Sequence, residues 1–238
     1  QITGLRISVT QRCNLRCFYC HNEGLTGKEL EASPDVFRDI CQTASRMGIR
    51  EVKITGGEPL VREDIIEIIE AVSKHIDEVS MTTNGTLLKG RTEMLYNAGL
   101  NRININLNTL NQRLYKEITG KNLIQDVMQG IEEAVDTGFY PIKINMVLMD
   151  INKDEIWKMM EYCQKYELIL QIIELEGDRG IEGSEWYTRH HVSLDDIERW
   201  CERNALHIST RKMHARKQYV IPLNGSEVTV EIVAPMHN

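Results

Sequence analysis

Short β-rich runs alternate with longer amphipathic stretches along most of this chain, and no other feature constrains its fold as strongly. The expected strands lie near residues 5–10, 51–55, 78–83, 102–107, 141–148 and 168–174. The expected helices lie near residues 34–48, 62–75, 89–98, 111–137 (broken near Gly120) and 152–166. Because such alternation builds right-handed βαβ units, the sequence predicts an α/β protein with a parallel sheet.

The number of units selects among the α/β folds. Six strands by residue 174 are too few for a closed eight-unit barrel, which typically takes about 250 residues. We therefore expect a partial (β/α)6 TIM-like barrel over residues 1–174 and a small C-terminal α+β appendage over residues 175–238. The chain starts at Gln1 and stops at Asn238 directly after an apolar run, so we expect it to be clipped at both ends.

The appendage is expected to begin with a polar loop over residues 175–192, followed by a helix from a Ser193 cap to Arg203. Its remaining runs indicate antiparallel strands near residues 206–212, 217–222 and 226–234, with Asn224-Gly225 as a hairpin turn. The appendage also carries a basic cluster of Arg211, Lys212, His214, Arg216 and Lys217. A solvated hairpin face explains this cluster better than a nucleic-acid or phosphate contact does.

Polar and apolar residues alternate within the expected strands. In the fourth strand the polar phase consists of Asn104, Asn106 and Asn108, and apolar residues fill the other phase. Since outer helices cover the outward face of such strands, the polar phase should point into the barrel. The sequence therefore predicts a polar interior.

Three cations, Arg6, Lys53 and Lys143, share this inward phase on three different strands. Inward charges are costly unless they are paired. Two interpretations follow: internal salt bridges with acidic residues, or an anionic ligand that carries phosphates.

Cys13, Cys17 and Cys20 stand in the spacing C-x3-C-x2-C directly after the first expected strand. Clustered thiolates suit soft metals, and a four-iron cluster normally takes four Cys ligands, so three leave one iron open for another ligand. A structural zinc site completed by His21, or a disulfide framework, fits the pattern less well. Single cysteines in helical patterns indicate small buried hydrophobic residues, and the chain has three of them: Cys41, Cys163 and Cys201.

The charge balance disfavours several classes of partner. Thirty-five acidic residues against 28 basic ones give a net charge of −7, which disfavours broad binding to nucleic acids or anionic membranes. No apolar run reaches the roughly 20 residues that a membrane-spanning helix needs. We expect a cytoplasmic protein with no nucleic-acid partner and no membrane partner.

Polar motifs follow several expected strands, at the rim where barrel enzymes build their active sites. The loop of roughly residues 11–33 that carries the three cysteines, called the cysteine loop below, follows the first strand. Gly56-Gly57-Glu58-Pro59 follows the second strand, and Thr83-Asn84-Gly85 ends the third. Adjacent glycines allow a ligand to approach the backbone closely, and a carboxylate such as that of Glu58 suits an ammonium group. These motifs predict a site at this rim.

The joint pattern resembles the radical S-adenosylmethionine (SAM) superfamily: C-x3-C-x2-C after a first strand, Tyr19 before the last cysteine, and GGEP after the second strand. More narrowly, nearly the whole chain is similar to the GTP 3',8-cyclase family of molybdenum-cofactor biosynthesis, and Cys-Phe-Tyr-Cys-His looks like its archaeal branch. The segments that carry this likeness are Leu5–Thr10, Lys53–Leu60, Thr82–Gly85, Ile118–Gly120 and Lys143–Asn145.

The resemblance implies that Cys13, Cys17 and Cys20 hold a [4Fe-4S] cluster whose open iron binds SAM, from which one electron releases a 5'-deoxyadenosyl radical. In this family the radical takes the 3' hydrogen of GTP, and C3' then attacks C8 of the guanine. The residues implied to contact the cofactor are Tyr19, Gly56, Gly57, Glu58, Thr83, Asn84 and Asn108.

The same resemblance assigns GTP binding to Arg6, Lys53 and Lys143 and names no catalytic side chain, because the cofactor carries the radical. It also implies a separate electron donor and is compatible with a homodimer. Two alternatives remain open. One is a radical SAM maturase of peptides or tetrapyrroles, and the other is a zinc-stabilised binding module that is not an enzyme.

The chain departs from the family pattern in three places. Asn106 and Asn108 stand where relatives commonly have Ser and Asp, and Gln171-Ile172-Ile173-Glu174 stands in place of Arg-Phe-Ile-Glu. The family also continues past a segment like Pro235–Asn238 into a second cysteine set, which binds an auxiliary [4Fe-4S] cluster. Those ligands are absent from this sequence, so either the appendage is truncated or the protein lacks the second cluster and has another function.

Overall fold

The computed structural model describes residues 2–20, 30–177, 183–210 and 216–234. Residues of interest that lie outside these ranges are His21, Arg211, Lys212, His214 and the segment 235–238. The chain forms two compact units: Gln1–Asn106 with Thr119–Ile142, and Leu107–Ile118 with Lys143–Asn238. The predicted domain boundary after residue 174 stays a prediction.

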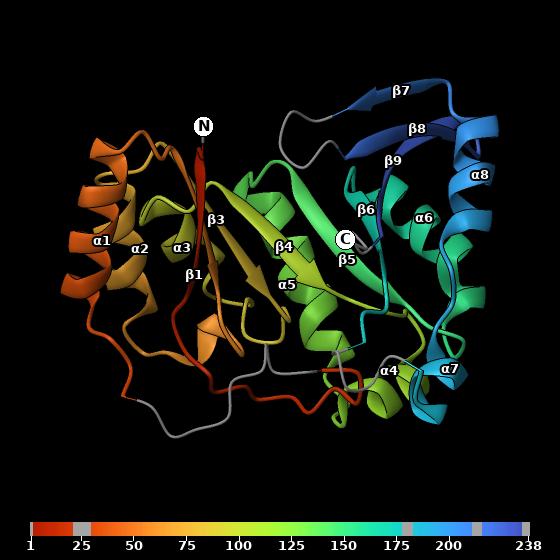
Figure 1. The fold of residues 1–238 in the computed structure, drawn as a ribbon, viewed down its shortest axis with the longest axis horizontal. Helices are drawn as coiled ribbons and strands as arrows, with labels where there is room; N and C mark the ends of the chain where they lie inside the picture. Colours follow the sequence, from red (N-terminus) through yellow and green to blue (C-terminus); the bar gives the residue numbers. More distant parts are fainter. Residues whose placement is uncertain (1, 21–29, 178–182, 211–215, 235–238) are drawn as a thin grey trace. The chain divides into compact units, whose positions relative to one another are not determined.

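The first unit contains four parallel strands in sequence order: β1 (Gly4–Ser8), β2 (Glu51–Thr55), β3 (Glu78–Thr83) and β4 (Arg102–Asn106). Its helices are α1 (Pro34–Arg46), α2 (Ile65–Ser73), α3 (Thr92–Asn97) and α5 (Ile124–Thr137), with a short 3-10 turn η2 (Pro59–Val61). Helix α1 packs beside α2, and α3 packs beside α5 (Figure 1).

Burial explains why these elements form. Strand residues of the apolar phase, such as Ile54 and Ile103, are completely buried. Helix α2 buries its apolar residues at helical spacing, namely Ile65, Ile68, Ile69 and Val72. Burial of each such side chain stabilises the folded state by about 1.5–3 kcal/mol relative to leaving it exposed to water. The alternation predicted from sequence is therefore what packs the helices onto the sheet.

The second unit contains β5 (Ile142–Leu148), β6 (Ile169–Glu174) and β9 (Ser226–Val233) as parallel neighbours, followed by antiparallel β8 (Lys217–Leu223) and β7 (His207–Thr210). Helix α6 (Ile156–Lys165) packs on β6 and β9, and α8 (Asp195–Asn204) packs on β8. The remaining elements are α4 (Gln112–Thr119), η3 (Lys153–Glu155) and α7 (Glu185–His190).

The predicted strands and helices are confirmed, including the helix break near Gly120 and the Asn224-Gly225 turn between β8 and β9. Two details of the appendage were wrong. Helix α7 lies inside the expected loop 175–192, where the Ser184 hydroxyl accepts the Tyr187 N–H and starts the helix. Helix α8 is capped at Leu194 rather than Ser193, although the Ser193 hydroxyl accepts the Asp195 N–H at 3.2 Å.

Strand β9 also pairs in parallel with β6. The sequence predicted β9 only as part of an antiparallel hairpin. None of the helices in the described ranges is both long enough and apolar enough to cross a bilayer.

Candidate functional site

The three predicted cluster ligands lie together on the loop after β1. Cys13 and Cys20 are exposed, Cys17 is half-buried, and none of the three forms a disulfide. The Cys20 N–H donates to the Cys17 carbonyl at 3.1 Å, which folds the last part of the motif into a turn. The Arg16 N–H donates to the Thr119 carbonyl at 3.0 Å and ties the loop to the rest of the first unit.

The electrostatics of this loop fit a metal cluster. Burial, together with the neighbouring Cys20 and Cys13 as thiolates, raises the pKa of Cys17 to about 12. Burial also raises the pKa of Cys13. Three cysteines that repel one another as thiolates are stabilised by a shared cation. Binding of that cation displaces the protons of the thiols.

In the described part of the chain, no three His, Cys, Asp or Glu side chains gather as ligands of a single metal ion. Cysteines of an iron-sulfur cluster each bind a different iron and need not converge on one point. The zinc alternative involves His21, which lies outside the described residues.

Gly56 and Gly57 bring the end of β2 against the start of the cysteine loop. The Gly57 N–H donates to the Thr10 carbonyl and the Glu58 N–H to the Arg12 carbonyl, both at 2.8 Å. A Cβ at Gly57 would lie 2.4 Å from the Arg12 oxygen, and one at Gly56 would lie 2.6 Å from the Thr10 oxygen. The close approach that these glycines allow is therefore to the chain's own backbone.

Glu58 is completely buried and links the ends of β2 and β3. Its carboxylate accepts hydrogen bonds from Leu60 N at 3.0 Å, Thr83 Oγ1 at 2.7 Å and Asn84 N at 2.6 Å. Burial raises the Glu58 pKa, and the bonds from Asn84 and Thr83 oppose that rise. Its predicted contact with the cofactor stays a prediction.

The other predicted cofactor residues also have contacts within the protein. The Asn84 amide donates to Asn14 Oδ1 at 2.8 Å, and in the second unit Asn108 Oδ1 accepts the Val147 N–H at 2.8 Å. A hydrogen bond from Tyr19 lowers the Cys17 pKa, against the larger effect of burial. These contacts fix the side chains, and the cofactor assignments remain predictions.

Arg62 clamps both flanks of the cysteine loop. Its guanidinium is buried and donates to the Val9 carbonyl at 2.8 Å and the Ala32 carbonyl at 2.9 Å. It also makes a bidentate contact with Asp64 at 2.8 and 2.6 Å. The hydrogen bond from Arg62 lowers the Asp64 pKa. Sequence reasoning missed Arg62, because nothing local to residue 62 indicates these distant partners.

The three predicted substrate cations divide between the units. In the first unit, Arg6 and Lys53 are register neighbours on β1 and β2, and Arg6 Nε donates to Thr55 Oγ1 at 3.4 Å. In the second, Lys143 on β5 is buried and its ammonium donates to both Glu231 oxygens at 2.6 and 2.5 Å. The sequence left two interpretations open for the inward cations, and for Lys143 the structure contains the internal salt bridge.

Glu231 is the most consequential residue that sequence reasoning missed. It is completely buried on β9 and also accepts from Gln171 Nε2 at 2.7 Å and Gln218 Nε2 at 2.6 Å. A signal existed, because Glu231 stands in the polar phase between the buried Val230 and Ile232.

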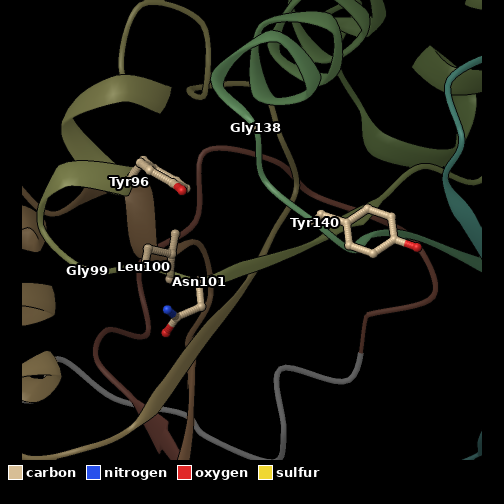
Figure 2. Close-up of a pocket in the computed structure, with 6 residues that line it drawn as sticks. All are labelled: Tyr96, Gly99, Leu100, Asn101, Gly138 and Tyr140. Carbon is tan, nitrogen blue, oxygen red and sulfur yellow. The ribbon is translucent and has the colours of Figure 1, made fainter.

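A hollow of about 420 Å³ lies away from these motifs, and Figure 2 shows the residues that line it: Tyr96, Gly99, Leu100, Asn101, Gly138 and Tyr140. Asn101 directly precedes β4, so the hollow lies at the amino end of that strand. The cysteine loop and GGEP follow the carboxyl ends of β1 and β2. None of the predicted site residues lines the hollow.

Comparisons with known proteins point to one family. The family model described as "Radical SAM superfamily" matches residues 7–163. Proteins named "Probable GTP 3',8-cyclase" are 45% identical in Pyrococcus horikoshii, over 238 residues that span the whole chain and 76% of that relative, and 42% identical in Methanothermobacter marburgensis, over the whole chain and 77% of that relative.

The crystal structure of Streptococcus suis SuiB bound to S-adenosylmethionine matches with a TM-score of 0.72 and 21% identity. The match covers 84% of this chain and 46% of SuiB, so the chain spans about half the length of that protein. At this identity the likeness speaks for the fold alone, and it confirms the predicted α/β class of the partial-barrel kind.

Proposed function

Because this chain belongs to the radical SAM superfamily and, within it, to the GTP 3',8-cyclase family, we propose that it cyclises GTP to (8S)-3',8-cyclo-7,8-dihydroguanosine 5'-triphosphate. This reaction belongs to molybdenum-cofactor biosynthesis. The observation that carries the proposal is the 45% identity over the whole chain to a relative with that name. The cysteine loop supports it independently, since it carries three cysteines that follow β1 and form no disulfide.

The chain's own residues have three tasks in this proposal. Cys13, Cys17 and Cys20 hold a [4Fe-4S] cluster, which together with bound SAM supplies a 5'-deoxyadenosyl radical. The carboxyl-end motifs that include Glu58 and Thr83 orient SAM. The cations of the strands bind the triphosphate of GTP, for which arginine and lysine are suited.

The proposal extends to partners and location. It includes a separate electron donor and a cytoplasmic location, and it is compatible with a homodimer. A second [4Fe-4S] cluster is part of the family expectation and stays a prediction. The three further cysteines, Cys41, Cys163 and Cys201, are each buried and do not supply a C-x2-C pair.

Anaerobic turnover tests the proposal. The chain is reconstituted with iron and sulfide and supplied with SAM, a reductant and GTP. We expect 5'-deoxyadenosine and the cyclised nucleotide in the wild-type protein, and neither product in Cys17→Ala. Cofactor cleavage without any GTP binding by calorimetry would favour the peptide or tetrapyrrole maturase instead, and a colourless, zinc-loaded protein would refute both radical proposals.

A further inference from the structure

Three side chains form a closed ring of hydrogen bonds beside the first cysteine. Asn84 Nδ2 donates to Asn14 Oδ1 at 2.8 Å, and Asn14 Nδ2 donates to Thr86 Oγ1 at 2.8 Å. The Thr86 hydroxyl closes the ring by donating to Asn84 Oδ1 at 2.7 Å. Each member therefore donates once and accepts once within the ring, an arrangement in which the bonds reinforce one another.

One side of the ring is rigid. Asn84 and Thr86 are buried, with 8% and 7% of their surface exposed. Asn84 N is held by the buried Glu58 at 2.6 Å, and Thr86 N donates to Asn84 Oδ1 at 3.0 Å. The turn after β3 is thus fixed to the core. Its residues Asn84 and Thr86 in turn hold Asn14 of the cysteine loop.

The ring also reaches the first ligand. Asn14 is the neighbour of Cys13 in the sequence, and Asn84 Nδ2 lies 3.9 Å from Cys13 Sγ, within the range of an N–H···S contact. The Leu15 N–H donates to the same sulfur at 3.4 Å. Hydrogen bonds to ligand sulfurs orient the ligand and tune the cluster that it binds.

We infer that Asn14, Asn84 and Thr86 are positioning residues that hold Cys13 in place for the cluster. Asn84, which the family resemblance assigns to the cofactor, has both ends of its amide engaged in this ring. The inference rests on the proposed cluster, but it concerns the protein frame that holds the ligand rather than the reaction.

The test compares three variants of the reconstituted holoenzyme. Thr86→Val removes the hydroxyl and keeps the shape, whereas Thr86→Ser keeps the hydroxyl. Thr92→Val is the matched control, because Thr92 is also buried and its hydroxyl accepts the Thr137 hydroxyl at 2.9 Å, away from the ring. The readouts are cluster absorbance during a challenge with EDTA, and the unfolding midpoint of each apo protein.

We expect Thr86→Val to lose its cluster about tenfold faster than the wild type, since changes behind metal ligands typically cost 10- to 100-fold in affinity. Thr86→Ser and Thr92→Val should lose it at the wild-type rate. Asn14→Ala, at a half-buried position, should lose its cluster as fast as Thr86→Val does. It replaces Thr86→Val in the test if Thr86→Val does not fold.

A wild-type rate in Thr86→Val, or an equal acceleration in Thr92→Val, would overturn the inference while leaving the proposed function intact. A wild-type chain that takes up no iron and sulfide would overturn the proposed cluster and, with it, the inference. The two failures are therefore distinguishable.

Discussion

Replacing Lys143 by methionine tests the buried ion pair of the second unit. The Lys143 side chain is 7% exposed and that of Glu231 is 0% exposed, so the variant leaves a carboxylate buried without its cation. Removing one partner of a buried pair costs about 3–5 kcal/mol of unfolding free energy. Because the amides of Gln171 and Gln218 still donate to Glu231, we expect the lower end, about 3 kcal/mol.

Urea unfolding of Lys143→Met, Glu231→Gln and the double variant measures this cost. In the double variant neither position of the pair carries a charge, so the double variant should recover at least half of the stability that Lys143→Met loses. Lys153→Met is the matched control. Lys153 forms an exposed pair with Asp150 at 2.6 Å, and because solvent screens such a pair we expect its loss to leave the urea midpoint unchanged.

This reasoning would be refuted if Lys143→Met lost less than about 1 kcal/mol of unfolding free energy, or if the double variant were no more stable than Lys143→Met. The result also bears on GTP. Since Lys143 is already neutralised by Glu231, weak GTP use by Lys143→Met is evidence for a substrate contact only if the double variant, restored in stability, shows the same weakness.

Two further substitutions test the frame of the cysteine loop. Gly57→Ala should cost about 1–3 kcal/mol in urea unfolding, since its Cβ would lie 2.4 Å from the Arg12 carbonyl, and an unchanged stability would contradict this. Asp64→Asn should cost about 1–2 kcal/mol at pH 7, because Arg62 lowers the folded-state pKa of Asp64. That contribution is present above the unfolded-state value of about 3.9 and is lost as the pH falls through the lowered folded-state pKa, so a difference that grows below pH 4 in urea unfolding would contradict the assignment.

Local periodicity was enough to predict most of the elements. The spacing of Ile65, Ile68, Ile69 and Val72 fixes which face of α2 is buried, and all four are completely buried. The interruption at Gly120 separates α4 from α5, because Gly120 adopts a φ of +77° that other residues rarely reach. These features depend on residues a few positions apart, which is the range that a single sequence expresses.

The contacts that define the candidate site depend on partners far apart in the sequence. Lys143 and Glu231 are 88 residues apart, and Asn14 and Thr86 are 72 apart. Periodicity indicates that Lys143 shares the polar phase of its strand, but it does not indicate which polar residue arrives opposite. Pairing of β9 with β6 brings Glu231 beside Gln171, and that neighbour relation follows from the fold rather than from local sequence.

The motifs that identify the family also hold the cysteine loop, and this changes how their substitution is interpreted. Gly57 and Glu58 bind the backbone of residues 10–12, and the turn at Asn84 binds Asn14. A variant in these motifs therefore moves the cluster ligands as well as removing any contact with SAM. Loss of cofactor cleavage identifies a SAM contact only where the variant loses its cluster to a chelator no faster than the wild type does. The rate of cluster loss to a chelator therefore has to be measured on every such variant.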